Sequence, residues 1–204
     1  SRLDIQLLKR SLTKHSSGLH LLPRPVELQV TNAITCDNIR KVIGLLKASF
    51  THLIIDLSKS YSLIDMAAIE SASKVVLITQ LDLPCLRNVV RLMMSFEEME
   101  DLKDKVEIVV NRVGLDSGQI SLKKAKETLG REVFALLPND YRTMVEVRNN
   151  GVPLIVQAPR AGITHAIREL AAKLDGANQQ HGEEADSTSK DSESKWKKFW
   201  PGTK

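Results

Sequence analysis

Apolar residues recur along the chain with two different spacings, and these spacings alternate over residues 1–174. Some runs are short and apolar almost throughout, which is typical of strands that are covered on both faces. These runs span residues 18–22, 52–57, 74–79, 106–111 and 133–138. Such strands need a layer of helices above and below them, so the runs predict an α/β protein.

Between these runs, apolar residues return every three to four positions, as on a helix with one buried face. The helical segments expected are 36–50, 62–72, 86–102, 121–129, a stretch near 139–149, and 164–174. Gly130 should end one of these helices, since glycine often follows the last helical turn. The alternation predicts a doubly wound α/β fold with a mostly parallel sheet and helices on both faces.

The composition changes abruptly after residue 174. Residues 175–194 are acidic and nearly free of apolar side chains, so they cannot bury enough surface to offset the entropy lost on ordering. We therefore expect one α/β domain over residues 1–174, a disordered acidic linker over 175–194 and a basic, aromatic tail over 195–204. A chain of 204 residues is long enough for one sizeable core of this kind.

Charge, cysteine content and hydropathy exclude several classes of protein. The net charge of +4 is mild and carboxylates lie between the basic residues, so we expect no nucleic acid partner. No apolar stretch approaches the roughly 20 residues that cross a bilayer. Cys36 and Cys85 lack the spacing of a metal site, which favours a reducing, cytoplasmic setting and predicts no metal-ligand cluster.

Polar residues at the ends of the predicted strands are the candidate site. Ligands of open α/β sheets collect at the carboxyl ends of the strands. Asp56 ends one strand and could act on a bound Mg²⁺, although a carboxylate there is more often a turn or cap residue. Asn111 offers a donor and an acceptor to the edge of a base, and the Arg112 guanidinium can stack on its ring. A plain turn with a surface arginine is the alternative.

Several ordered blocks of sequence carry a family resemblance. They are IIDL, SASKVVLITQLDLPCLRN, VVNRVG, LPND and NNGVPLIVQAPRAGITHAIRELAAKL. In this order they resemble the C-terminal two thirds of the MinD/ParA deviant-Walker ATPases. Within that family they are most similar to the CpaE-like branch of pilus-assembly and localisation proteins, and the resemblance covers roughly residues 3–174.

The resemblance implies an ATP and Mg²⁺ site. It makes Asp56 the Walker B-type aspartate that acts on Mg²⁺ through water, and it places Asn111 and Arg112 in the adenine pocket. The loop that closes the other side of the base would be formed by Pro138, Asn139 and Asp140. A homodimer that forms through the nucleotide face is also implied by the family.

The sequence departs from the family at the phosphate site. The family uses a glycine-rich loop with lysines, of the kind K-G-G-x-G-K-[ST], whose amides and lysines hold the triphosphate. This chain has no Gly-Lys pair, so we expect it to lack the first strand–helix unit of the domain, or else to be a homologue that has lost the loop. The segment after Asp56 also lacks the prolines and glycine of the family's switch loop, although Ser58 or Ser60 could bond a phosphate or water.

Without the phosphate loop, the chain should have no catalytic residues and hydrolyse no ATP. Asn111 and Arg112 could contribute on the order of 1 kcal/mol each, which predicts adenine binding of millimolar strength or weaker. The leading hypothesis is part of a CpaE-like ATPase that assembles or positions a pilus or secretion apparatus at the membrane. The alternative is a non-catalytic scaffold or localisation protein that keeps the fold without hydrolysis.

The last ten residues have a composition of their own. On one helical turn, the rings of Trp196, Phe199 and Trp200 would share a face, and Lys197 and Lys198 would flank it. This pattern is typical of an anchor at a membrane interface, and docking on another protein is an equally open interpretation. On the first interpretation, the tail makes a peripheral contact with the inner face of the membrane.

Overall fold

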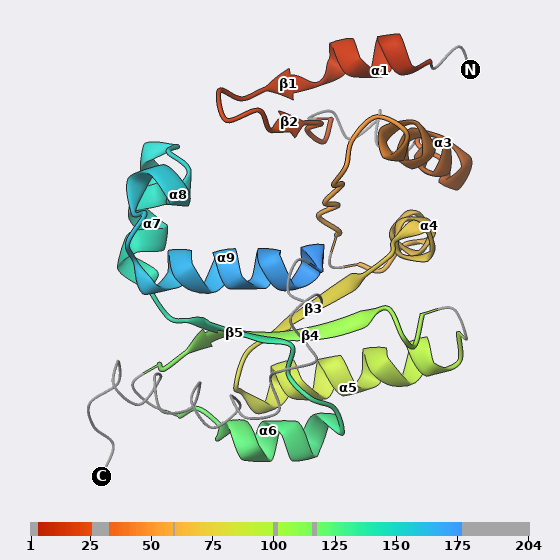
Figure 1. Ribbon diagram of the computed structural model, residues 1–204. Helices are drawn as coiled ribbons and strands as arrows, with labels where there is room; N and C mark the ends of the chain where they lie inside the picture. The colour runs from red at the N-terminus through yellow and green to blue at the C-terminus, as the bar shows by residue number, and fades with distance from the viewer. Residues whose placement is uncertain (1–3, 26–32, 59, 100–101, 116–117, 177–204) are drawn as a thin grey trace. The chain divides into compact units, whose positions relative to one another are not determined.

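The computed structural model describes residues 4–25, 33–58, 60–99, 102–115 and 118–176 (Figure 1). They belong to two compact units. The first unit comprises Ser1–Leu77 and Arg91–Glu107, and the second comprises Ile78–Val90 and Ile108–Lys204. None of the helices in the described part of the chain has the length and apolar content needed to cross a membrane.

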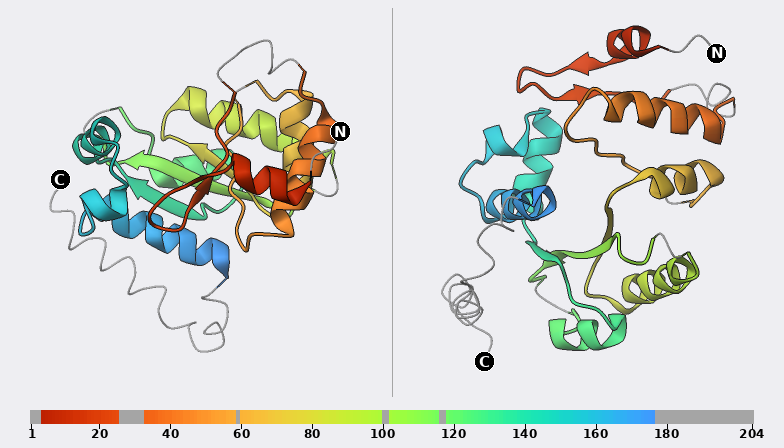
Figure 2. Two further views of the ribbon diagram at one scale, coloured as in Figure 1. Left: turned by 90° about the horizontal axis from the view of Figure 1, so that it is seen from above. Right: turned by 45° about the vertical axis from the view of Figure 1, so that its right-hand side comes forward.

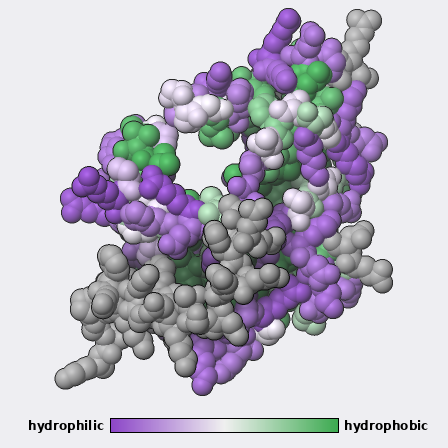
Figure 3. Space-filling view, in the orientation of Figure 1, coloured by the Kyte–Doolittle hydropathy of each residue, from purple (hydrophilic) through white to green (hydrophobic). Residues whose placement is uncertain are grey.

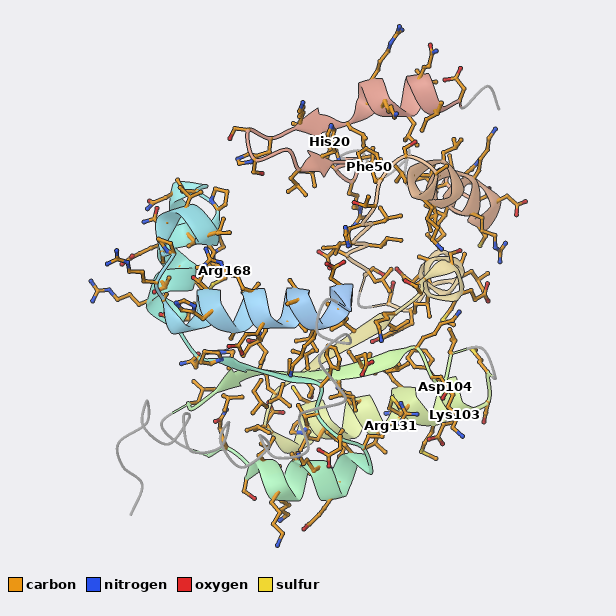
Figure 4. All side chains as sticks on the ribbon, in the orientation of Figure 1. His20, Phe50, Lys103, Asp104, Arg131 and Arg168 are labelled. Atoms are coloured by element: carbon orange, nitrogen blue, oxygen red, sulfur yellow. The ribbon has the colours of Figure 1, made fainter. Side chains whose placement is uncertain are left out.

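The first unit begins with a short helix and a hairpin. Helix α1 (Ile5–Ser11) is followed by strands β1 (Thr13–Lys14) and β2 (His20–Leu21), which pair antiparallel. Only two residues of the run at 18–22 therefore form a strand. The imidazole of His20 packs on the ring of Phe50, with 5.1 Å between the ring centroids (Figure 4). Figure 2 shows the hairpin beside helix α3 (Cys36–Lys47).

Helices α3 and α4 (Leu63–Ser71) pack together and supply much of the core of this unit. Their buried apolar side chains are Ile43, Leu46, Ala67, Ala68 and Ile69. The contact is closed at its rim by Lys47, whose Nζ donates to the carbonyl of Ser71 at the end of α4. Both helices lie where the apolar spacing predicts them.

The predicted strand over residues 52–57 is wrong. The segment has no regular secondary structure, and Ile54 is 92% exposed. An apolar run is buried as a strand only when neighbouring strands and helices cover it, and within the described residues this segment belongs to neither sheet. The apolar run alone could not indicate that no strand among the described residues pairs with this segment.

Strands β3 (Val75–Thr79), β4 (Val106–Val113) and β5 (Ala135–Pro138) form a sheet in that order, at the positions of the other three apolar runs. Strand β4 pairs with β5 in parallel, with Val109 opposite Ala135 and Val110 opposite Leu136. The middle strand holds the most deeply buried residues of the sheet, since Ile108, Val109 and Val110 are almost completely buried. Apolar side chains are needed at these three positions because both faces of a middle strand are covered.

Helices cover both faces of the sheet, as expected for a doubly wound fold. Helix α9 (Gly162–Asp175) lies along one face, and α5 (Leu83–Glu97) and α6 (Leu122–Leu129) lie against the other (Figure 1). Side chains fill the layers between these helices and the strands (Figure 4). Helix α6 ends at Gly130, whose φ of 63° is in the left-handed region, as the sequence predicts.

Two short helices connect β5 to α9. Helix α7 (Tyr141–Asn150) corresponds to the predicted stretch near 139–149, whereas α8 (Leu154–Gln157) has no counterpart among the predicted segments. Neither helix buries a residue completely. Figure 3 shows hydrophobic side chains gathered over α8, where Ile155 and Val156 are exposed.

Candidate functional site

The carboxyl ends of β3, β4 and β5 each lead into a connection that belongs to the second unit. The residues after β3 and those before α6 are joined by a hydrogen bond, which the Ile120 amide donates to the Leu81 carbonyl over 2.8 Å. The residues after β4 and β5 are joined by another, from the Asn139 amide to the Val113 carbonyl, also at 2.8 Å. These bonds bring the strand ends to one edge of the sheet, where ligands of α/β proteins bind.

Strand β4 ends in a bulge at the predicted base-binding residues. Val110 lies opposite Leu136 and Val113 lies opposite Pro138, so two residues of β4, Asn111 and Arg112, face one residue of β5. The backbone of Arg112 has a φ of 57°, which is uncommon for a residue with a side chain. The Asn111 side-chain oxygen accepts a hydrogen bond from the Arg112 amide over 2.8 Å, which supports this turn.

The loop after the bulge is held by one side chain, that of Gln119. Its Oε1 accepts hydrogen bonds from the amides of Gly114 (2.9 Å) and Leu115 (3.1 Å). Its Nε2 donates to the carbonyl of Arg112 over 2.8 Å. Gln119 is half-buried, so these three bonds are partly shielded from water. The side chain therefore fixes the path of the backbone on both sides of Val113.

Arg112 also reaches the loop that follows β5. Its guanidinium Nε donates to the side-chain oxygen of Asn139 over 3.3 Å. Both side chains are half-buried. Asn111, Arg112 and Asn139 thus come together in the structure, and they present amide groups and a planar cation at one edge of the sheet.

The two remaining residues of the predicted closing loop have local roles. Asp140 is the N-cap of α7, and its Oδ1 accepts a hydrogen bond from the amide of Thr143 over 3.1 Å. Pro138 ends β5 and is half-buried. The Asp140 carboxylate is thus engaged in the helix cap. The side chain of this loop that bonds Arg112 is that of Asn139.

Asp56 lies in the first unit, in the segment that has no regular structure, and its side chain is exposed. The serines that follow it are engaged within their own loop. The Ser58 hydroxyl donates to Asp65 over 2.6 Å, and the hydroxyls of Ser58 and Ser60 are 2.7 Å apart. Both hydroxyls therefore already have a hydrogen-bond partner within this loop.

Asp65 organises this loop. Its carboxylate is buried and accepts hydrogen bonds from the amide and hydroxyl of Ser58 and from the amide and hydroxyl of Ser62, at distances from 2.6 to 3.2 Å. Ser62 is also the N-cap of α4, which begins directly after it. Burial alone would raise the pKa of Asp65, but the hydrogen bonds outweigh burial and lower the pKa from its ordinary value.

Tyr61 lies between the two serines that bond Asp65, and its φ of 49° is left-handed. Partial burial and, second, the negative charge of Asp65 raise the pKa of the Tyr61 phenol. In the described part of the chain, Tyr61 and Arg112 are the residues other than glycine with positive φ. Tyr61 lies in the loop after Asp56 and Arg112 lies at the end of β4, and the family resemblance associates both segments with the nucleotide.

Sequence reasoning missed Gln119 and Asp65. Each acts through contacts with residues three to seven positions away, and no periodic pattern marks them. The one local signal was the serine at 62 with the aspartate at 65, a spacing typical of a helix capping box. The tail residues Trp196, Lys197, Lys198, Phe199 and Trp200 lie outside the described residues.

Comparisons with known proteins bear on these residues. No protein-family model matches the chain. An uncharacterized ATP-binding protein of Methanocaldococcus jannaschii is 23% identical over 173 residues, which covers 85% of this chain and 64% of the relative. The septum site-determining protein MinD of Thermotoga maritima is 22% identical over 174 residues, which covers 82% of this chain and 63% of the relative. The chain thus spans less than two thirds of the length of these curated relatives.

Solved structures resemble the fold closely. A ParA family ATPase of Chlorobium tepidum has a TM-score of 0.78 at 24% identity, and the match covers 85% of this chain and 71% of that one. MinD of Pyrococcus horikoshii, complexed with Mg-ADP, has a TM-score of 0.73 at 20% identity, covering 86% and 72%. A chain of the MinC:MinD cell division protein complex of Aquifex aeolicus has a TM-score of 0.69 at 21% identity, and the match covers 86% of this chain and 70% of that one.

These structures define the class of fold, which is the P-loop NTPase-like α/β fold of the MinD and ParA proteins, with a parallel sheet between layers of helices. At these identities the solved structures show the fold, and the curated matches show that the sequence is similar to an ATP-binding protein and to a MinD protein.

Proposed function

We propose that this chain is part of a MinD/ParA-type ATPase of the CpaE-like branch, which acts in assembling or positioning a pilus or secretion apparatus at the membrane. The chain supplies the rim of the nucleotide site that holds the base. ATP and Mg²⁺ are the cofactors of the whole protein, and this chain by itself binds them weakly and hydrolyses no ATP. The protein works in the cytoplasm as a homodimer that forms through the nucleotide face.

One observation carries the proposal. Asn111 and Arg112 at the end of β4 meet Asn139 after β5, and the bond from Arg112 to Asn139 spans these two neighbouring strand ends. Amide groups can pair with the edge of a base, and a guanidinium plane can stack on its face. The homologous proteins include one described as ATP-binding and one complexed with Mg-ADP, which favours an adenine base.

Asp56 fits Mg²⁺ only together with a nucleotide. Mg²⁺ keeps most of its water and is usually bound by one or two carboxylates plus the phosphates of the substrate. Asp56 is exposed, and the described residues contain no group of three or more histidine, cysteine, aspartate or glutamate side chains that could hold a metal. Asp56 would therefore accept a hydrogen bond from a water on Mg²⁺, and the ion would neutralise the charge of the phosphates.

Titration of the isotope-labelled chain with adenosine monophosphate, followed by NMR, tests the base site. Shifts should appear at the amides of Asn111, Arg112 and Asn139, with a dissociation constant on the order of 1 mM. Arg112→Ala should remove most of the response, whereas Arg148→Ala, which removes an exposed arginine of α7, should leave it unchanged. Equal shifts with guanosine monophosphate, or shifts confined to other residues, would contradict an adenine site.

The second candidate function is a scaffold that keeps the fold without hydrolysing nucleotide. It is favoured by the loop after Asp56, since the Ser58 hydroxyl bonds Ser60 and Asp65 within the loop. The DNA upstream of the codon for Ser1 separates the two candidates. A glycine-rich loop with lysines encoded there supports the ATPase, whereas a start codon directly before Ser1 supports the scaffold.

The tail is proposed to bring the protein to the membrane. In the sequence, Trp196, Phe199 and Trp200 stand beside Lys197 and Lys198, a composition that suits the headgroup level of an anionic leaflet. The chain should co-sediment with vesicles that contain anionic lipid, and a variant with Trp196→Ala and Trp200→Ala should not. Equal sedimentation of both variants would favour a protein as the partner of the tail.

A further inference from the structure

We infer that Gln119 is a positioning residue of the base site, because it holds Arg112 in the backbone conformation from which the guanidinium reaches Asn139. This inference rests on the proposed function where it concerns nucleotide, and on the geometry of the loop alone where it concerns Arg112. The three hydrogen bonds of the Gln119 side chain all go to backbone atoms. Gln119 acts through the backbone of residues 112–115.

The hydrogen bonds of Gln119 surround the bulge. Its Nε2 binds the Arg112 carbonyl, and its Oε1 binds the amides of Gly114 and Leu115. The residue between them, Val113, is fixed to the neighbouring strand end through the Asn139 amide. The loop is therefore held from two sides, by a side chain from the segment before α6 and by the backbone after β5.

This support is needed because the conformation of Arg112 is unfavourable. A φ of 57° brings the Cβ of an ordinary residue close to its own backbone and costs roughly 1 kcal/mol or more. Such a conformation persists only where surrounding contacts determine it. Asn111 and Gln119 supply these contacts, since Asn111 accepts from the Arg112 amide and Gln119 donates to the Arg112 carbonyl.

The consequence is a preorganised guanidinium. A bulge re-aims the side chain of the residue it contains, and here the re-aimed side chain makes the bond to Asn139 across two strand ends. If the loop relaxed, Arg112 would return to an ordinary φ, and its side chain would leave the edge of the sheet. A base would then have to order the arginine on binding, which weakens affinity.

Gln119→Met tests the inference, because methionine has a similar size and makes none of the three hydrogen bonds. Gln119→Glu keeps the acceptor for Gly114 and Leu115 and loses the donor to Arg112. Gln157→Met is the control, since Gln157 is an exposed glutamine of α8. Three quantities are measured by NMR on the labelled chain: amide exchange at Gly114 and Leu115, the Arg112 Nε–H signal, and affinity for adenosine monophosphate.

In Gln119→Met, amide exchange at Gly114 and Leu115 should rise about fivefold, as expected for the loss of one net hydrogen bond each. The Arg112 Nε–H signal should move to the position of a free guanidinium. Affinity for adenosine monophosphate should fall several-fold while the unfolding midpoint stays nearly the same. A purely structural role would lower the unfolding midpoint as well. Gln119→Glu should keep the slow exchange while the Arg112 signal still moves.

An Arg112 signal that is unchanged in Gln119→Met would overturn the inference, and so would faster exchange that leaves nucleotide affinity unaltered. If the unmodified chain binds no adenosine monophosphate, the proposed function fails instead. In that case the Arg112 signal still decides whether Gln119 positions the guanidinium, because this signal does not depend on nucleotide.

Discussion

Removal of the Asp65 carboxylate should destabilise the loop that follows Asp56 together with the start of α4. The carboxylate accepts two hydrogen bonds from Ser58 and two from Ser62. A hydrogen bond to a charged group contributes about 1.5 to 3 kcal/mol when it is shielded. Both serines are exposed, so water can replace part of what is lost, and counting only two bonds at the lower value gives about 3 kcal/mol for Asp65→Ala.

Acid titration provides a second measure of the same interaction. Folding lowers the pKa of Asp65, so the unfolded chain takes up the proton first as the pH falls. The stabilisation is therefore complete above the ordinary carboxyl pKa of about 4, and it is lost as the pH falls through the lower pKa of the folded protein. The difference in stability between the unmodified chain and Asp65→Asn should be constant near neutral pH and shrink below about pH 4.

Denaturant unfolding at a series of pH values measures both effects. Asp37→Ala is the control, because the Asp37 side chain is 95% exposed and its ion pair with Arg40, at 3.5 Å, is open to solvent. It should change the free energy of unfolding by less than about 1 kcal/mol. The reasoning is refuted if Asp65→Ala costs no more than this control at neutral pH, or if the difference from Asp65→Asn persists unchanged in acid.

Further predictions follow from the backbone and from one thiol. Arg112→Gly should be about 1 kcal/mol more stable to denaturant than Arg112→Ala, because both lose the guanidinium and only glycine adopts a φ of 57° without strain; equal stability would mean that the backbone is unstrained. Gly44→Ala in the interior of α3, where an added Cβ meets nothing within 4 Å, should stabilise by about 0.5 to 1 kcal/mol. Gly130→Ala, at a φ of 63°, should instead destabilise by about 1 kcal/mol. Thermal melts check both, since Gly44→Ala should raise the melting temperature and Gly130→Ala should lower it. Burial and, second, Asp82 raise the pKa of Cys85, so alkylation of this thiol should need a higher pH than that of a free thiol, and Asp82→Asn should shift the alkylation profile to lower pH.

The helices and the central strands could be predicted from sequence because their signals are local. The run at 106–111 contains three consecutive β-branched apolar residues and became β4, and the segment predicted as a helix over 62–72 became α4 with its serine cap. Helix α6 ends at Gly130 because glycine adopts the left-handed conformation of a helix end without strain. Such features depend on contacts within a few residues, which a sequence displays directly.

The rest depends on contacts that a sequence does not display. Residues 52–57 have the composition of a strand, but a strand also requires a hydrogen-bonding neighbour, which the described residues do not give to this segment. Asn111, Arg112 and Asn139 were predicted as site residues, and the structure brings these three together. The bulge that aims Arg112, and the glutamine that holds it, arise from tertiary hydrogen bonds between residues of unremarkable local pattern.

The exposed segment at 52–57 should also affect the tendency of the chain to aggregate in solution. His52–Leu57 contains two adjacent isoleucines and no proline or glycine, the kind of short window that forms intermolecular β-structure during aggregation. Asp56 is the one acidic residue in this window, and we expect it to act as a gatekeeper against self-assembly. Replacing Asp56 with alanine should therefore promote precipitation on heating, whereas Asp56→Glu, which keeps the charge, should not.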